Sequence, residues 1–268
     1  MTFDSFVYEE RDGIATVRLN DPDRLNALTF QTYGDLERLM RELADQDAVK
    51  VVVLTGTGKG FCSGGSVHDI IGKLIQMKGE ELYQFTRMTC NVIQNMRTLR
   101  KPIIAAVNGI AAGAGAMLAL ASDFRVLSEG AKFAFLFTKV GLAGADMGAL
   151  YLLPRIIGEG RATELLFLGD PIGAEEAYRI GLATRVVQDQ KLMDETYALG
   201  RRLKEGPLFA LGTTKTLLRL EARADLETAL ELEAKAQARC MEHPDFHEGY
   251  RAFLEKRHPR FNQGASPN

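Results

Sequence analysis

The sequence predicts an α/β protein, because short apolar runs alternate with segments of helical periodicity. The runs at residues 49–55 and 103–107 have the length and composition of buried strands. Residues 51–54 and 103–107 each lead into a loop of very small residues, and helical sequence follows. The recurring order of strand and helix is typical of βαβ units with a parallel sheet.

The elements before the first buried strand are a hairpin and a helix. Residues 6–10 and 14–19 are β-rich runs joined through Arg11, Asp12 and Gly13, which predicts a β-hairpin. Thr29 is expected to cap a helix with its side-chain oxygen. Apolar positions recur along that helix at helical spacing, at Leu36, Leu39, Met40 and Leu43.

After the first buried strand we expect a polar, Met-rich helical region at about residues 72–97 and further strands near residues 124–127 and 184–187. From Pro207 to Arg257 the pattern is helical without an obvious strand. We therefore expect a core formed by residues 1–200 and a helical region at residues 201–268.

Composition argues against several classes of partner. The chain has 268 residues and a formal net charge of −2 with mixed signs, so neither nucleic acid nor a membrane surface is expected to bind it. The three cysteines lack CxxC spacing, so neither a disulfide framework nor a zinc site is expected, and a reducing compartment fits. The N-terminal residues show no signal or transit pattern, so we expect a cytoplasmic protein.

Two loops of small residues carry the main functional signal. Residues 107–117 (VNGIAAGAGAM) and residues 61–66 (FCSGGS) each follow an apolar strand. Small residues let a ligand reach bare backbone N–H groups at a positive helix N-terminus, and two such loops could form an oxyanion hole. Each loop taken alone is more often a tight strand-to-helix connection, and it is the pair that favours the oxyanion hole.

Four segments in this order resemble the crotonase superfamily, the enoyl-CoA hydratase/isomerase family. They are residues 24–28 (RLNAL), 60–65 (GFCSGG), 101–109 (KPIIAAVNG) and 252–257 (AFLEKR). The resemblance implies a ClpP/crotonase-like spiral of repeated ββα units. It also implies that the C-terminal helical region covers the site and mediates oligomerisation, as a homotrimer or a dimer of trimers.

The resemblance implies an acyl-CoA thioester as substrate and no permanently bound cofactor, since coenzyme A enters as part of the substrate. Its oxyanion donors fall on the N–H groups of Gly65 and Ala114. Many relatives have glycine at the second position, so alanine there requires a negative φ. Typical hydratases use two glutamates, and the corresponding positions here are Met117 and Phe137, neither of which transfers protons. The two-glutamate hydration mechanism is therefore not expected.

Asp146 is the expected catalytic carboxylate. It falls, with one extra residue in the loop, where some isomerases, hydrolases and a dehalogenase of the family keep an aspartate. Its apolar neighbours, such as Met117, Phe137 and Met147, are expected to raise its pKa and make it a usable base. The alternative is a loop turn or helix cap.

Coenzyme A contacts are carried over from the same resemblance. The adenine is expected near the backbone of Arg24 and Ala27, and the phosphates near His68 and Lys256. Lys256 is equally compatible with an exposed salt bridge. The full set of expected contacts is Arg24, Ala27, Ser63, Gly65, His68, Phe253 and Lys256.

The predicted activity is isomerisation or hydration of an unsaturated acyl-CoA, linear or cyclic, through a stabilised thioester enolate. One alternative is hydrolysis of a thioester or a carbon–carbon bond by the same oxyanion hole and aspartate. Another is a non-catalytic protein that binds acyl-CoA.

Overall fold

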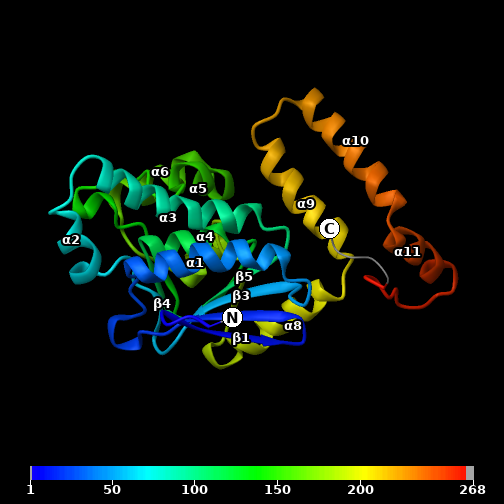
Figure 1. Cartoon of the computed structure of the whole chain (residues 1–268), viewed down its shortest axis with the longest axis horizontal. Coiled ribbons are helices and arrows are strands. Elements are labelled where there is room, and N and C mark those ends of the chain that lie inside the picture. Colours follow the sequence, from blue (N-terminus) through cyan, green and yellow to red (C-terminus); the bar gives the residue numbers. More distant parts are fainter. Residues whose placement is uncertain (1, 264–268) are drawn as a thin grey trace.

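The computed structural model describes residues 2–263, and its core contains two β-sheets (Figure 1). In the first sheet β1 and β2 pair antiparallel, and all other neighbours pair parallel. The hairpin and the parallel strands are therefore confirmed. In spatial order its strands are β1 (Phe6–Arg11), β2 (Ile14–Leu19), β3 (Val51–Gly56), β5 (Ile103–Val107), β7 (Phe124–Ser128) and β10 (Arg185–Val187).

The second sheet consists of very short strands. In spatial order they are β4 (Gly60–Cys62), β6 (Ile110–Ala112), β8 (Lys132–Ala134) and β9 (Ile172–Gly173). A strand of the first sheet is followed by a strand of the second in the pairs β3–β4, β5–β6 and β7–β8, and a helix comes next. This alternation is the spiral of ββα units expected from the sequence. The two small-residue segments differ from the expectation in one respect, because each contains a short strand, β4 or β6, and is not a loop throughout.

Helices pack against the sheets and also form the C-terminal part of the chain. They are α1 (Phe30–Glu42), α2 (Gly72–Leu74), α3 (Glu80–Thr98), α4 (Ala114–Ala121), α5 (Ala149–Ile157), α6 (Glu159–Leu168), α7 (Ala174–Arg179), α8 (Leu192–Lys204), α9 (Leu208–Glu221), α10 (Leu226–Glu242) and α11 (Pro244–Leu254). Single helical turns are η1 (Pro22–Arg24), η2 (Leu43–Asp45), η3 (Val67–Ile71), η4 (Thr138–Val140) and η5 (Asp189–Lys191). Within residues 2–263, no helix is both long and apolar enough to cross a bilayer.

Local sequence signals explain where some helices begin. The Thr29 side chain accepts a hydrogen bond from the N–H of Thr32 at 3.2 Å, so the predicted cap of α1 is confirmed. The helix expected over residues 72–97 is interrupted, because Gly79 adopts a positive φ of 49° directly before α3. The expected region is therefore divided into α2 and α3 rather than forming one continuous helix.

The central strands β3 and β5 of the first sheet are buried on both faces, as their continuous apolar runs predict. Val52 and Leu54 of β3 point into the main core, which also contains Leu36 of α1. Val51 and Val53 point to the opposite face, where α8 packs with Leu199. Because side chains alternate along a strand, one run of four apolar residues supplies both cores.

The C-terminal helices leave the core after α8. On α9, the buried Lys215 ammonium lies 2.7 Å from the Asp123 carboxylate and joins the helix to the core. Helix α10 has no buried residue, and α10 and α11 project away from both sheets (Figure 1). The boundary expected at residue 200 falls inside α8, and residues 264–268 of the expected C-terminal region lie outside the described residues.

Candidate active site

The two small-residue loops meet in space. A Cβ atom added to Gly64 would lie 3.0 Å from the carbonyl oxygen of Ala112 and 3.6 Å from the amide nitrogen of Ala114. Gly64 also has a φ of +100°, which favours glycine. The loop after β4 and the loop after β6 are thus in direct contact through a residue that has no side chain.

The Gly65 amide is left free by the pairing of its neighbours. Leu28 forms a bridge beside it, with its N–H donating to Gly64 O at 2.7 Å and its carbonyl accepting from Ser66 N at 2.8 Å. Within residues 2–263 the N–H of Gly65 itself donates no hydrogen bond to the backbone. It is therefore available to a ligand.

The Ala114 amide is free because it opens α4. The positive φ in this loop, 49°, falls on Gly113, and Ala114 has a negative φ. The sequence therefore needs glycine at 113 and tolerates alanine at 114. The first N–H groups of a helix have no intrahelical acceptor and carry partial positive charge, so this amide suits an oxygen that gains negative charge.

Two asparagines hold the first loop in place, and the sequence analysis assigned neither a role. The buried Asn26 side chain accepts from Asp21 N at 2.9 Å and donates to the carbonyls of Thr57 and Gly60 at 2.9 and 2.7 Å. Asn108 donates to Gly60 O as well, at 3.0 Å. Both residues lie inside the quoted motifs, which was the available signal.

Asp146 lies between η4 and α5, and its side chain is partly buried. Its carboxylate accepts a hydrogen bond from the N–H of Met147, and its own carbonyl accepts from Ala149 N at 2.9 Å. Burial raises the pKa of the Asp146 carboxyl, and the Met147 hydrogen bond offsets part of this rise. The raised pKa expected from the apolar surroundings is confirmed.

The backbone after Asp146 is unusual, because Met147 and Gly148 both have positive φ, at 47° and 83°. A methionine in this conformation is strained by about 1–3 kcal/mol, and buried packing keeps it there. Such strain is common where a loop must present a side chain in one orientation.

Tyr33 of α1 is a second polar group near the carboxylate, and the sequence analysis overlooked it. Burial raises the pKa of the Tyr33 phenol well above its ordinary value, and the charges of Cys62 and Asp146 add to the rise. The signal that could have revealed it is helical spacing, since Tyr33 shares a face with Leu36 and Met40. Burial raises the pKa of the Cys62 thiol to about 12, so Cys62 is a poor nucleophile.

The two positions at which typical hydratases have glutamate are apolar and buried. Met117 of α4 is 0% exposed and Phe137 is 6% exposed, and both belong to the main core. Neither side chain can hold or move a proton. The positions that the resemblance aligns with the two glutamates therefore offer no carboxylate.

Most of the expected coenzyme A contacts lie together beside the first loop. The Arg24 guanidinium contacts the Asp69 and Asp21 carboxylates at 2.6 and 2.7 Å, and Ser63 Oγ donates to Arg24 O at 3.0 Å. His68 is exposed on η3 next to Asp69. Arg24 and Ala27 line a polar pocket of about 330 Å³.

Phe253 and Lys256 are not brought to this cluster within one chain. Phe253 is 81% exposed near the end of α11, and Lys256 follows that helix. The C-terminal helices lie at the opposite end of the molecule from β4 and α2 (Figure 1). In this structure α10 and α11 thus do not cover the site of their own chain.

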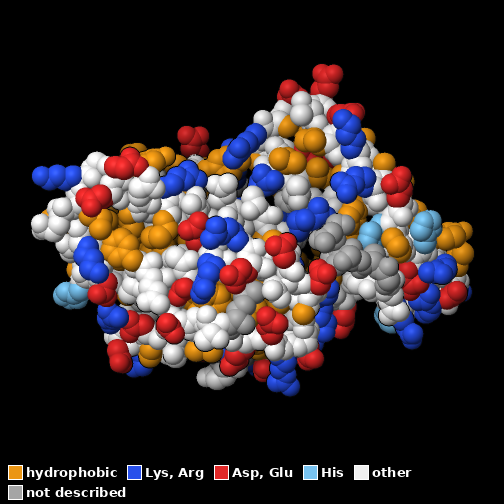
Figure 2. All heavy atoms as spheres, in the orientation of Figure 1, with side chains coloured by type: hydrophobic (Ala, Val, Ile, Leu, Met, Phe, Trp, Pro, Cys, Tyr) orange, Lys and Arg blue, Asp and Glu red, His pale blue; other side chains and the backbone are white. Residues whose placement is uncertain are grey.

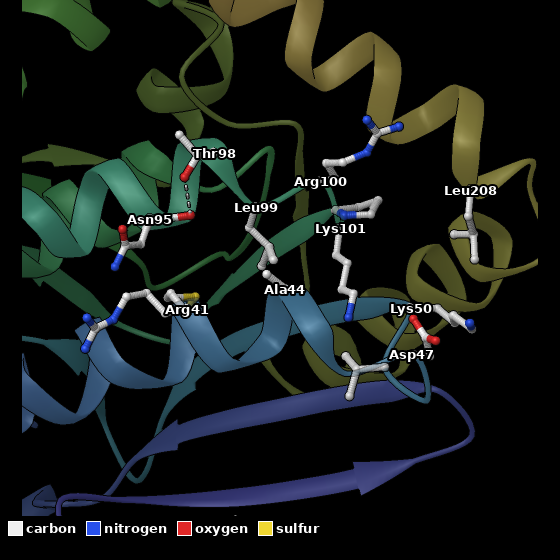
Figure 3. A pocket seen from close by; sticks show the side chains of 13 residues that line it. Arg41, Ala44, Asp47, Lys50, Asn95, Thr98, Leu99, Arg100, Lys101 and Leu208 are labelled. Atoms are coloured by element: carbon white, nitrogen blue, oxygen red, sulfur yellow. Dashed lines mark hydrogen bonds between the residues drawn. The ribbon is translucent and has the colours of Figure 1, made fainter. Parts of the chain in front are cut away.

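A separate pocket of about 360 Å³ lies at the far end of α1, between that helix, the end of α3 and the start of α9 (Figure 3). There the Lys101 ammonium donates to the carbonyls of Leu43 and Gln46 and so binds the C-terminal end of α1. The N-terminal end of α1, which adjoins Gly65, is roughly 18 Å away along the helix. This pocket is not part of the oxyanion site.

Across residues 2–263 no group of three or more His, Cys, Asp or Glu side chains could hold a metal ion. What the site offers is two free backbone N–H groups, one carboxylate with a raised pKa, and a protonated phenol. This arrangement can stabilise an oxyanion and transfer a proton.

Comparison with known proteins agrees with this chemistry. The sequence model of the enoyl-CoA hydratase/isomerase family matches residues 9–264. The 1,2-epoxyphenylacetyl-CoA isomerase of Escherichia coli K12 is 36% identical over 93% of this chain and 95% of its own length. The crotonyl-CoA hydratase of Syntrophomonas wolfei is 34% identical over 97% and 99% of the two chains.

A solved structure gives the same result. The crystal structure of an enoyl-CoA hydratase-like protein from Streptomyces coelicolor A3(2) superposes with a TM-score of 0.96 at 49% identity, covering 98% of this chain and 96% of that chain. The similarity spans nearly the whole chain and includes the fold. The proteins named here are all described by acyl-CoA reactions. The chain belongs to the enoyl-CoA hydratase/isomerase family, the crotonase superfamily, and is an acyl-CoA hydratase/isomerase-type enzyme.

Proposed function

We propose that this enzyme isomerises or hydrates an unsaturated acyl-CoA through a thioester enolate, with Gly65 and Ala114 as oxyanion donors and Asp146 as base and acid. The observation that carries the proposal concerns Asp146, whose carboxyl has a raised pKa. The positions aligned with the two hydratase glutamates hold the apolar residues Met117 and Phe137 instead. The two adjacent free amides supply the second half of the chemistry.

In the isomerisation, the thioester oxygen accepts hydrogen bonds from the N–H groups of Gly65 and Ala114. The Asp146 carboxylate removes a proton from the α-carbon, or from the vinylogous γ-carbon, and the electrons of that C–H bond move to the thioester oxygen. The enolate then returns these electrons, and the new carboxylic acid gives the same proton to the other carbon. The product has the mass of the substrate, and Asp146 is ionised again.

A single carboxylate suits isomerisation, because the group that takes the proton also returns it. Hydration remains open, since the same amides stabilise the enolate formed when water adds to the β-carbon. The relatives include proteins named for each reaction, the 1,2-epoxyphenylacetyl-CoA isomerase and the crotonyl-CoA hydratase. The apolar side chains of Met117 and Phe137 favour a bulky acyl group, such as a cyclic one, over a short linear one.

For coenzyme A itself, the polar pocket beside Arg24 and Ala27 supports binding of the adenosine part, with Ser63, Gly65 and His68 alongside. Phe253 and Lys256 can join this site only from another copy of the chain, because they lie at the opposite end of their own. We therefore propose that residues 201–268 mediate assembly into a homotrimer or a dimer of trimers, in which these helices cover a neighbour's site.

The surface of the C-terminal helices supports this assembly. Hydrophobic side chains gather over α9 and α10 (Figure 2), where Leu218, Leu226 and Leu230 are 66%, 75% and 56% exposed. Exposed apolar patches of this kind mark interaction sites. We further propose a cytoplasmic location, because Cys62, Cys90 and Cys240 are all free thiols.

The test is to incubate the protein with a panel of acyl-CoA thioesters, linear and cyclic, and to follow the products by mass. No change in mass together with a changed spectrum means isomerisation, and a gain of one water means hydration. Release of free coenzyme A identifies the alternative hydrolase. If no thioester is altered but several bind, the protein is a non-catalytic acyl-CoA binder and the proposal is wrong.

A further inference from the structure

Tyr33 lies close in the chain path to the first small-residue loop because of the way α1 begins. Leu28 pairs with Gly65, the next residue Thr29 caps α1, and the N–H of Tyr33 donates to Thr29 O at 3.1 Å. Tyr33 therefore lies one turn, about 6 Å along the helix, from the loop that supplies the first oxyanion amide. Its side chain packs in the same core cluster as Met117 and Met147.

The Tyr33 ring is held firmly, but its hydroxyl group is unused. The residue is 3% exposed, and the ring packs edge-on against Phe85 with 5.8 Å between centroids. Within residues 2–263 the hydroxyl has no hydrogen-bond partner. Its oxygen is not fully enclosed, in contrast to the unpartnered hydroxyl of Tyr151, so it keeps some accessible surface.

The nearby carboxylate does not use this donor. Asp146 takes its hydrogen bond from the Met147 N–H, although its charge is close enough to raise the pKa of Tyr33. Because that pKa is high, the phenol stays protonated and acts as a donor. A buried hydroxyl without an acceptor is costly and rare, which suggests that a bound ligand supplies the acceptor.

We propose that Tyr33 is a specificity-determining residue, whose hydroxyl donates a hydrogen bond to an oxygen atom on the acyl chain, beyond the thioester. The substrate class is then oxygenated unsaturated acyl-CoA thioesters, with a hydroxyl, carbonyl or ether oxygen on the acyl part. A pure hydrocarbon chain leaves the phenol unpaired in an apolar wall, so the site discriminates against it. This inference rests on the proposed function of the same site.

The test compares Tyr33→Phe with the wild type on two substrates, an enoyl-CoA and the same enoyl-CoA with a hydroxyl group on its acyl chain. The wild type is expected to prefer the hydroxylated substrate in kcat/KM by about tenfold or more, as one buried hydrogen bond allows. In Tyr33→Phe the ratio of kcat/KM between the two substrates is expected to fall to about one. Equal losses on both substrates, or none, would overturn the proposal.

Two controls keep the result interpretable. Tyr83→Phe changes a tyrosine of α3 that is 58% exposed, and it should leave both substrates unaffected. Calorimetric binding of the saturated analogues, with and without the hydroxyl group, measures the same preference without turnover. If the wild type alters no acyl-CoA at all, the proposed function has failed; if it turns over both substrates without preference, only this inference has failed.

Discussion

The side chains of Asn26 and Asn108 donate to one and the same acceptor, since their Nδ2 atoms lie 2.7 and 3.0 Å from the carbonyl oxygen of Gly60. Gly60 is the first residue of β4, the strand that leads into the first oxyanion loop. Asn26 precedes α1 and Asn108 follows β5. Two segments far apart in the sequence thus fix the position of the loop that presents Gly65.

Replacing Asn26 by Ala should therefore loosen this loop. Asn26→Ala removes three hydrogen bonds and leaves buried backbone groups unpaired, so the free energy of unfolding should fall by about 1–3 kcal/mol. Asn108→Ala should act similarly. Chemical denaturation of both single variants and the double variant measures the coupling, and strictly additive effects would show that Gly60 does not link the two residues.

Replacing Gly64 by Ala should damage both stability and turnover. The φ of +100° and a contact of 3.0 Å with Ala112 O leave no room for a Cβ atom, so the loop must move. We expect a destabilisation of about 1–3 kcal/mol and a clear loss in kcat, measured by thermal unfolding and steady-state kinetics. Gly34→Ala is the control, because it adds a methyl group in open space on α1 and should stabilise by about 0.5–1 kcal/mol.

Replacing Asp146 by Asn should abolish most of the proton transfer while preserving the fold. The expected loss in kcat is about 100- to 10,000-fold, with little change in coenzyme A binding. Asp170→Asn is a matched control, since that exposed aspartate pairs with Lys139 on the surface. A kcat close to that of the wild type in Asp146→Asn would remove this carboxylate from the mechanism.

The pH dependence of the rate follows from the raised pKa of Asp146. A general base must be ionised, so kcat should fall as the pH drops through the folded-state pKa, at a midpoint above the ordinary value of 3.8. Because the pKa is raised on folding, ionised Asp146 opposes folding at neutral pH, and this effect is lost as the pH falls. Asp146→Asn should therefore be the more stable protein at neutral pH, by a margin that shrinks in acid.

Charges placed on the exposed face of α10 should disrupt assembly. Leu226 and Leu230 are one turn apart and largely exposed, so the double variant Leu226→Glu, Leu230→Glu should weaken association by about 100-fold or more. Analytical ultracentrifugation reads the oligomer, and turnover should fall with it. Glu231→Gln, on the same helix, should leave the oligomer intact. An unchanged mass for the double variant would mean that this face is not an interface.

Strong local patterns made the first sheet predictable. The β1–β2 hairpin, the Thr29 cap and the buried runs of β3 and β5 were all expected, because turn chemistry, capping and apolar runs are readable from neighbouring residues. The strands of the second sheet have at most three residues, too few to show a period. These short strands are stabilised by pairing with strands from other turns of the spiral. Their partners lie far away in the sequence, so the local pattern does not predict them.

The site was predictable in its parts but not in its connections. Motif residues pointed to Gly65, Ala114 and Asp146 as candidates, whose roles remain proposals. The sequence could not show that Gly113, not Ala114, takes the positive φ, nor that Tyr33 reaches the surroundings of Asp146 from another element. Helical periodicity also left open where α10 and α11 point. An apolar helix face can pack on its own chain or on another copy, and the sequence pattern is the same in both cases.

The free amides of Gly65 and Ala114 have a consequence for how such an enzyme diverges. Backbone N–H groups are present in every residue except proline. Substitutions at these two positions therefore seldom remove the hydrogen-bond donor. In the proposed function the group that moves the proton is the side chain of Asp146, which a single substitution can exchange for another. The backbone hydrogen-bond donors are thus kept as long as the path of the backbone is kept. The side chain that moves the proton can change, and the reaction can change with it.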